Sequence, residues 1–204
     1  MRFAARAGVA ISLVVARALF AQDARLAARL DKPTLLAVNA IVDSARISKL
    51  PTEPLVDKAL EGAAKGSEGT NIVTAVHQLS VRMGSAKRVL GPGTTSDEIK
   101  SAASAMDVGV SVHDLAMLRS ASGKKPVTLP LAVLTDLVGR NVPISAATSV
   151  VLQLARAGVK DADLALFQRN VRADIDRGAD PTAAATTRAR GLVLRGGSPT
   201  KPAE

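Results

Sequence analysis

The chain has no cysteine and almost no aromatic side chains: its 204 residues include three Phe and no Trp or Tyr. Without cysteine it cannot form disulfides, thiolate nucleophiles, zinc–thiolate sites or iron–sulfur clusters. Aromatic rings are the platforms on which unpaired bases stack, so their scarcity excludes that mode of nucleic-acid binding. Basic residues could still contact phosphates, but such binding alone is weak and sensitive to salt.

Apolar residues make up 47% of the chain and are mostly Ala, Val and Leu. Ala and Leu are among the best helix formers, and a core of small aliphatic side chains suits closely packed helices. The short alternating runs of β-branched and aromatic residues that are typical of strands do not occur. We therefore predict an all-α protein, a bundle of about eight short helices packed as antiparallel hairpins in an irregular or solenoid-like array.

The first 21 residues have the order of a secretion signal. Arg2 and Arg6 provide a positive start, an apolar run (AGVAISLVVA) covers 7–16, and small residues follow up to Ala21. The run is far shorter than the ~20 apolar residues that span a bilayer. We therefore interpret 1–21 as a signal peptide and expect a periplasmic or secreted protein with no transmembrane segment after cleavage.

Two details of this segment stay open. Cleavage after Ala18 competes with cleavage after Ala21, since small residues flank both positions. The alternative to a signal peptide is a buried first helix of a cytosolic protein, which Arg17, directly after the apolar run, favours.

The formal net charge is +9, and cleavage after Ala21 would remove Arg2, Arg6 and Arg17 and leave +6. Half of that excess lies in 182–204, so the segment 22–181 is only mildly basic, at +3. A high isoelectric point that comes from arginine-rich ends is a weak argument for nucleic acid, which an exported protein seldom meets. We predict no nucleic-acid partner, and weak contact of the basic end with anionic envelope polymers as an alternative role.

Apolar spacing and cap residues predict the helices in order. They are 34–47 with Thr34 as N-cap, one between Pro51 and Gly66, 71–90, two short helices after capping boxes at Thr95 and Ser111, 129–139, 145–157, 161–177 with Asp161 as cap, and a last one from Pro181 to Gly191. The predicted organisation is a helical domain over 22–191 and a disordered tail over 192–204.

One spacing recurs: Pro51 to Gly66 and Pro143 to Gly158 are both fifteen residues apart. Aligned on the prolines, Leu60 matches Leu152, and both fall on a predicted core stripe; the first stripe comprises Leu55, Val56, Ala59, Leu60 and Ala63. A duplicated α-hairpin would produce this pattern. Any antiparallel hairpin with a Pro start and a Gly stop would also produce it, and we favour that simpler interpretation because two copies do not establish a period.

The two histidines, His77 and His113, are the first candidates for chemistry. A helical metal site needs a second ligand at a spacing such as i and i+4, and neither histidine has a His or carboxylate there. We therefore predict that both are surface or boundary residues.

The other candidates also lack a motif. The glycine-rich segment 62–70 holds Lys65, but Gly rather than Ser or Thr follows that lysine, and a helix rather than a strand precedes it, which argues against a phosphate loop. Asp57 and Glu61 form an acidic pair on one helix, and Asp107 and Asp114 could approach each other in the fold. No G-x-S-x-G elbow is present. The sequence thus assigns no catalytic, cofactor-binding or metal-binding residue and implies no cofactor.

The leading hypothesis is a non-enzymatic module that acts through protein contacts with an unknown partner in the cell envelope or periplasm. The alternatives are an exported enzyme whose site the sequence does not reveal, and an anionic-polymer binder acting through the arginine-rich C-terminal segment. A cleft that brings His77 or His113 against a carboxylate would favour the enzyme. An exposed apolar groove would favour the protein-binding module, and a single basic face would favour the polymer binder.

Overall fold

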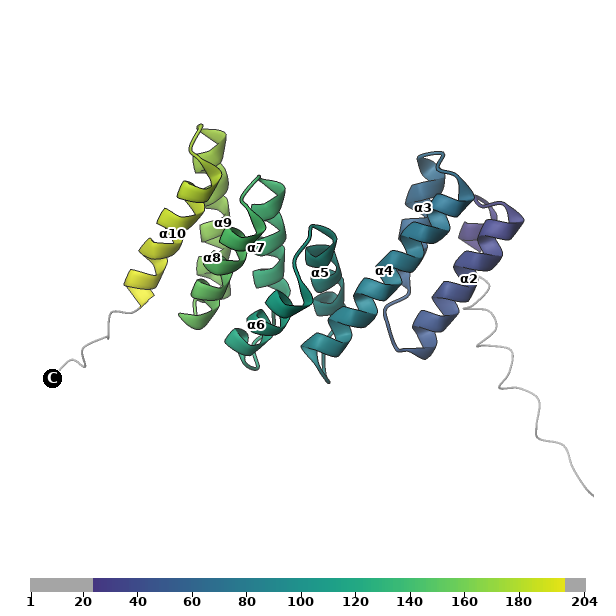
Figure 1. The fold of residues 1–204 in the computed structure, drawn as a ribbon, viewed down its shortest axis with the longest axis horizontal. Coiled ribbons are helices and arrows are strands. Elements are labelled where there is room, and N and C mark those ends of the chain that lie inside the picture. The colour runs from purple at the N-terminus through teal and green to yellow at the C-terminus, as the bar shows by residue number, and fades with distance from the viewer. Residues whose placement is uncertain (1–23, 197–204) are drawn as a thin grey trace, which may run out of the picture. The chain divides into compact units, whose positions relative to one another are not determined.

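The computed structural model describes residues 24–196, and every regular element in that part of the chain is a helix (Figure 1). This confirms the predicted all-α class. Residues 24–27 are helical. The helices that follow are α2 (Lys32–Ile47), α3 (Glu53–Ala64), α4 (Gly69–Leu90), α5 (Ser96–Asp107), α6 (Val112–Ser122), α7 (Thr128–Gly139), α8 (Ile144–Arg156), α9 (Asp161–Asp176) and α10 (Pro181–Gly196).

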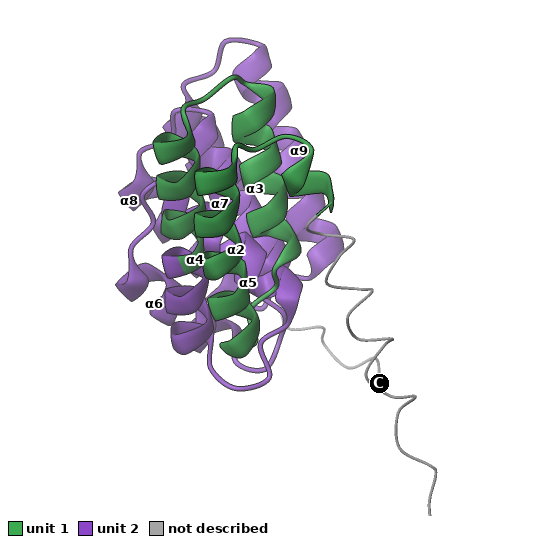
Figure 2. Cartoon of the chain, turned by 90° about the vertical axis from the view of Figure 1, so that its right-hand side faces the viewer, with its two compact units in different colours: residues 1–80 green, residues 81–204 purple. Residues whose placement is uncertain are grey.

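The chain divides into two compact units, 1–80 and 81–204, where the sequence predicted one helical domain over 22–191 (Figure 2). The division falls inside α4, which continues through it as one helix. Near the start of α4, the Ile72 side chain lies against Gly62 of unit 1. Near its end, Ala86 and Leu90 belong to the core of unit 2. A single long amphipathic helix therefore supplies apolar side chains to both units.

Two helix starts follow the predicted capping boxes. The hydroxyl of Thr95 accepts the backbone N–H of Glu98, whose carboxylate accepts the Thr95 N–H in return. Ser111 and Asp114 exchange the same pair of bonds at the start of α6. Such reciprocal bonds satisfy amides that no earlier turn of the helix can reach.

Two other predicted caps are wrong by a few residues. The N-cap of α2 is Asp31, whose carboxylate accepts the backbone N–H of Thr34 at 3.3 Å. Thr34 itself is buried inside the first turn, because α2 begins three residues earlier than its apolar stripe. At α9 the cap position is Lys160, which makes no side-chain cap bond, and Asp161 is the first helical residue. A carboxylate at that position still favours the helix through the dipole.

Six helix ends in the described part of the chain share one turn geometry. At each of them one residue has positive φ, between 53° and 97°; these residues are Lys49, Gly66, Gly109, Asn141, Gly158 and Gly178. In each case that residue donates its N–H to the carbonyl three residues back, and the next residue donates to the carbonyl five residues back. This is the hydrogen-bond pattern of a Schellman turn. The turns follow α2, α3, α5, α7, α8 and α9, so the turns before Pro51 and Pro143 and the glycine stops at Gly66 and Gly158 share one geometry.

Unit 2 is built in two layers. The first layer holds α5, α7 and α9, with α7 packed against both of the others, and the second holds α6, α8 and α10, with α8 packed against both of the others. The layers are joined where α7 meets α8 and α9 meets α10. Each hairpin therefore packs on the one before it, as in a solenoid, which agrees with the array that the sequence predicted.

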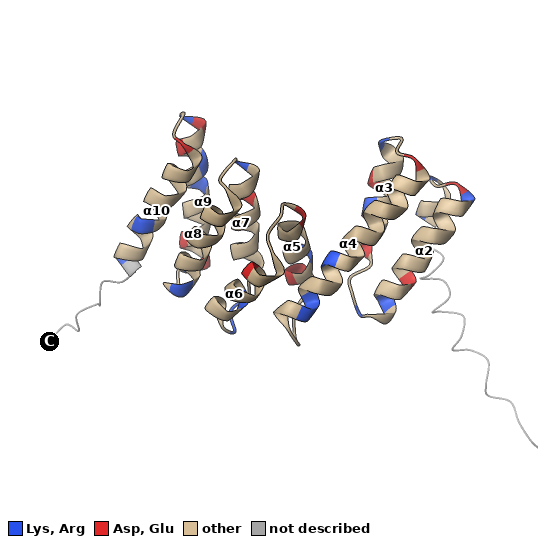
Figure 3. Ribbon diagram, in the orientation of Figure 1, with Lys and Arg blue, Asp and Glu red and all other residues tan. Residues whose placement is uncertain are grey.

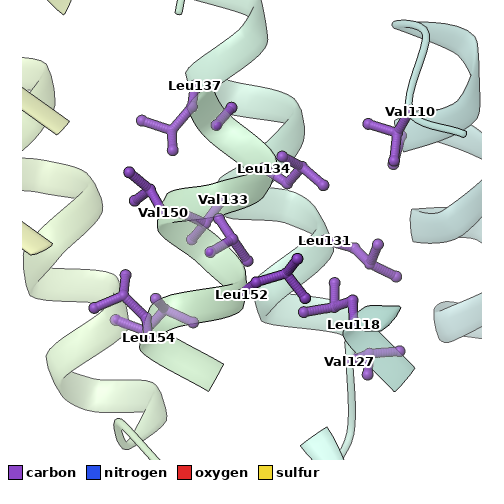
Figure 4. Packing of buried hydrophobic residues seen from close by; sticks show 14 of the residues in the cluster. Val110, Leu118, Val127, Leu131, Val133, Leu134, Leu137, Val150, Leu152 and Leu154 are labelled. Atoms are coloured by element: carbon purple, nitrogen blue, oxygen red, sulfur yellow. The ribbon is translucent and has the colours of Figure 1, made fainter. Parts of the chain in front are cut away.

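The core of unit 2 fills the space between these layers (Figure 4). Leu131, Leu134 and Leu137 from α7 are at most 2% exposed, and Leu154 from α8 is 1% exposed. Leu152 is also buried, as predicted. Because most core residues are Ala, Val or Leu, stability depends on many small close contacts rather than on a few large side chains.

Unit 1 contains the hairpin of α2 and α3 with the first half of α4. Gly69 lies so close to α2 that a Cβ atom there would be 2.0 Å from the hydroxyl oxygen of Thr34, so this contact requires glycine. On α3 the predicted stripe is buried only in the first two turns, at Leu55, Val56 and Ala59. Leu60 and Ala63, predicted to be core, are half-buried.

The last helix is longer than predicted. α10 continues to Gly196, past the predicted end at Gly191, so the first part of the predicted tail, 192–204, is helical. Leu192 and Val193 pack against the core of unit 2, and this burial carries the helix through Gly191. Residues 197–204 and the predicted signal peptide, 1–21, lie outside the described residues.

Candidate functional site

The structure places both histidines on the surface. His77 on α4 and His113 on α6 are exposed. Within residues 24–196 neither histidine forms an ion pair. The same range holds no cluster of three or more His, Asp or Glu that could bind a metal ion. The arrangement that would favour an enzyme, a histidine held against a carboxylate in a cleft, is not formed by either residue.

The glycine-rich segment, 62–70, covers the end of α3, the turn at 65–68 and the start of α4. The ammonium group of Lys65 contacts the Glu61 carboxylate, which also accepts from Lys58 at 3.0 Å. The hydrogen bond from Lys65, the bond from Lys58 and the two positive charges lower the pKa of Glu61 to about 2. Lys65 is thus paired with Glu61 where a phosphate loop would need it free for a ligand. Asp57, the other member of the predicted acidic pair, is exposed.

The remaining predicted carboxylates have separate structural partners. Asp107 forms an ion pair with Arg82 at 2.8 Å. Asp114 accepts hydrogen bonds from the amide and the hydroxyl of Ser111. These contacts explain both acids as parts of helix packing and capping.

Glu98, the most buried acid among the described residues, joins three elements. Its Oε2 completes the Thr95 capping box, and its Oε1 accepts the N–H of Val127 at 3.1 Å and a bond from Arg119 at 3.3 Å. Arg119 in turn donates to the carbonyls of Gly123 and Lys125. Burial raises the pKa of Glu98, but the bonds from Thr95 and Val127 and the charge of Arg119 outweigh it, so the pKa lies below its usual value.

Buried Glu98 and half-buried Arg119 border an open depression of about 530 Å³ that Thr94, Lys124 and Pro126 also line. Both carboxylate oxygens already accept hydrogen bonds from the protein, and the guanidinium closes the loop between α6 and α7. We interpret the Glu98–Arg119 pair as a clasp that fixes the start of α5 to that loop, because its polar groups are engaged within the fold.

A groove between α9 and α10 has a different character. It encloses about 270 Å³ and is lined by Leu166, Phe167, Asn170, Asp174, Thr187, Arg188, Gly191, Leu192 and Arg195. We call this the α9–α10 groove. Leu166 is 42% exposed, and Leu194, one turn beyond Gly191, is 76% exposed. Large aliphatic side chains in contact with solvent beside a concavity are typical of a contact surface.

Gly191 is one of the residues that line the groove. A Cβ atom built at this position would have no neighbour within 4 Å. The residue is in the interior of α10, where glycine is less favourable than alanine by about 0.5–1 kcal/mol. Nothing in the packing of α10 therefore requires glycine here.

The charged residues that line the groove are Arg188, Arg195 and Asp174; Figure 3 marks the basic and acidic positions along α9 and α10. Arg188 holds Asp174 with two bonds, at 2.6 and 2.9 Å, and Arg177 adds a third at 2.7 Å. These bonds keep the pKa of Asp174 below its usual value, the bond from Arg188 being the largest cause. Arg195, which also lines the groove, has no ion-pair partner within the described residues.

No protein family matches the chain, and no similar protein is found among the curated proteins or the solved structures. Roles for individual residues therefore follow from the geometry alone. Within the described part of the chain, no helix has both the length and the apolarity needed to cross a membrane.

Neither the clasp nor the groove was identified from the sequence. A signal for the groove is present in the sequence: Leu164, Phe167, Val171 and Ile175 recur at spacings of three and four along α9, and Leu166 falls outside this stripe. A large aliphatic residue off the stripe marks an exposed apolar side chain. The arginines at 188 and 195 were assigned to a basic terminal segment, whereas the structure places them on a packed helix.

Proposed function

We propose that this chain is an exported, non-enzymatic helical module that acts through protein–protein contacts in the cell envelope or periplasm. The observation that supports it most is the α9–α10 groove, which combines exposed aliphatic side chains with polar and charged walls. Of the arrangements that would separate the hypotheses, an exposed apolar groove is the one that favours a protein-binding module.

The alternatives have less support. An enzyme would need reactive groups held together in a cleft, and the candidate acids and histidines are engaged in capping or ion pairs, or lie exposed. A polymer binder would use the arginines at 188, 190 and 195 as one basic face. Arg188 is paired with Asp174, and the same groove has an apolar floor.

Export is tested by the intact mass of the protein isolated from its host. We expect a mass that corresponds to a chain starting at Gln22, or at Leu19 if cleavage follows Ala18. A full-length chain recovered from the cytosol would contradict export.

The contact site is tested by site-specific crosslinking, for which the absence of cysteine is an advantage. A single cysteine is introduced as Gly191→Cys, or as Gly139→Cys at the exposed end of α7, where a Cβ atom also has no neighbour within 4 Å. Each variant is labelled with a photoactivatable thiol reagent and irradiated with its native envelope fraction. We expect a discrete crosslinked protein from position 191 and not from position 139. Equal yields at both positions, or none at 191, would contradict the proposed contact site.

A further inference from the structure

The floor of the α9–α10 groove is aliphatic and aromatic. Phe167 is 1% exposed and closes the bottom, while Leu166 and Leu192 line the sides and are more accessible. A binding partner gains the most from such a floor by inserting apolar side chains, at roughly 25 cal/mol per Å² of apolar area removed from water. A ligand that carried only charge would leave this floor unused.

The rim of the groove is cationic. Arg188 and Arg195 line it, and Arg177 joins Arg188 in pairing with Asp174, the single carboxylate among the described lining residues. Three arginines thus face one carboxylate, and Arg195 has no ion-pair partner among the described residues. Surfaces that recognise each other generally have complementary potentials. The rim therefore favours a partner that carries negative charge beside its apolar side chains.

The packing within unit 2 indicates the shape of the occupant. In one layer α7 packs on α5, and α9 packs on α7. In the other layer α8 packs on α6, and α10 packs on α8. In every case the element that covers a helix face is another helix. A helix laid along α9 and α10 would extend the same two-layer packing by ridges that fit into the groove.

We propose that the occupant of the α9–α10 groove is an acidic amphipathic helix of a partner protein, with leucine-like side chains against Leu166 and Leu192 and glutamates or aspartates toward Arg195. This inference rests on the proposed function and specifies the chemistry of the partner. The segment 197–204 of the chain itself (GSPTKPAE) does not match, because it has no large aliphatic residue and only one acidic residue. An anionic polymer does not match either, since it offers nothing to the apolar floor.

The experiment measures the affinity of labelled synthetic peptides by fluorescence anisotropy at physiological salt. The probe is a helix-forming peptide of leucines at helical spacing with glutamates at most other positions. Its counterparts carry glutamine or lysine in place of glutamate. We expect the glutamate peptide to bind, the glutamine peptide to bind several-fold more weakly, and the lysine peptide not to bind.

Two pairs of variants locate the site. Arg195→Glu should weaken binding of the glutamate peptide by about fivefold, as expected for reversal of an exposed charge, and Arg190→Glu is the control with the same charge change on another face of α10. Gly191→Leu fills the groove and should abolish binding, whereas Gly139→Leu adds the same side chain elsewhere. Because both glycines have open space at Cβ, thermal melts of all variants should match the wild type or exceed it.

Several results would overturn the inference. The first is equal affinity for the glutamate and glutamine peptides, and the second is an equal loss of affinity in Arg195→Glu and Arg190→Glu. The third is a polymer site, which would be indicated if polyphosphate displaced the peptide while Gly191→Leu left peptide binding unchanged. If no peptide binds, the acidic helix is the wrong occupant, while crosslinking from position 191 in the envelope fraction still decides the proposed function separately.

Discussion

Removal of the Glu98 carboxylate tests how unit 2 is held together. In Glu98→Ala the N–H of Val127, a residue with no exposed surface, loses its acceptor. A buried amide left without a partner costs about 1–3 kcal/mol. The Thr95 amide loses its half of the capping box, and Arg119 loses the carboxylate it contacts. Taken together, we expect a loss of about 3–5 kcal/mol in the free energy of unfolding, as for breaking a buried pair.

The matched control is Asp114→Ala. Asp114 occupies the same third position of the other capping box, but its bonds to Ser111 are exposed to water. Water can replace them, so the expected loss is about 0.5–1 kcal/mol. Urea unfolding followed at 222 nm gives both values, with unchanged slopes expected for each variant. If the two alanine variants lost the same stability, the clasp would have no special role and this reasoning would be wrong.

The same clasp has a defined dependence on pH. The pKa of Glu98 is lowered in the folded protein, so its contribution is fully present above the unfolded value of about 4.3 and is lost as the pH falls through the folded value. The difference in unfolding free energy between the wild type and Glu98→Gln should therefore be constant near neutral pH and shrink in acid. A difference that grew in acid would contradict the assignment of an ionised Glu98.

Three further predictions concern single side chains. Leu152→Asp puts a charge into the buried core of unit 2, at a cost of several kcal/mol against a total stability of about 5–15 kcal/mol, so its helical signal at 222 nm should be lost or melt far below the wild type. His77→Ala and His113→Ala should each change stability by less than about 0.5 kcal/mol and leave crosslinking from position 191 intact; loss of a measured activity with an unchanged melt would instead favour the enzyme hypothesis. Gly191→Ala should stabilise by about 0.5–1 kcal/mol, whereas Gly109→Ala should destabilise, because its φ of +97° strains any other residue; thermal melts in which both changes act in the same direction would contradict this.

The sequence predicted those features of the fold that depend on local chemistry. The capping boxes at Thr95 and Ser111, and the Pro and Gly signals around 51–66 and 143–158, all coincide with helix ends, because each satisfies backbone groups within a few residues. Element types were therefore predictable from propensity, caps and spacing.

Features that depend on distant residues were not predictable. Leu60 continues the stripe of α3 but is only half-buried, since burial depends on which neighbour covers the helix. Glu98 looks like an ordinary capping residue until the fold brings Val127, 29 residues later, to its second oxygen. The α9–α10 groove likewise needs two helices in place before Leu166 and Arg195 face the same space. Its walls come from different parts of the sequence with no fixed spacing between them.

The most direct test of the central claim is thiol labelling in living cells with a maleimide too polar to cross the cytoplasmic membrane. Gly139→Cys should react in intact cells at the rate of the purified protein, which requires export. Gly191→Cys should react about tenfold more slowly in cells than when purified, as expected for a partner present at about ten times its dissociation constant. Reaction at neither position until the cells are lysed would contradict export, and equal rates at both positions in cells would contradict a partner in the α9–α10 groove.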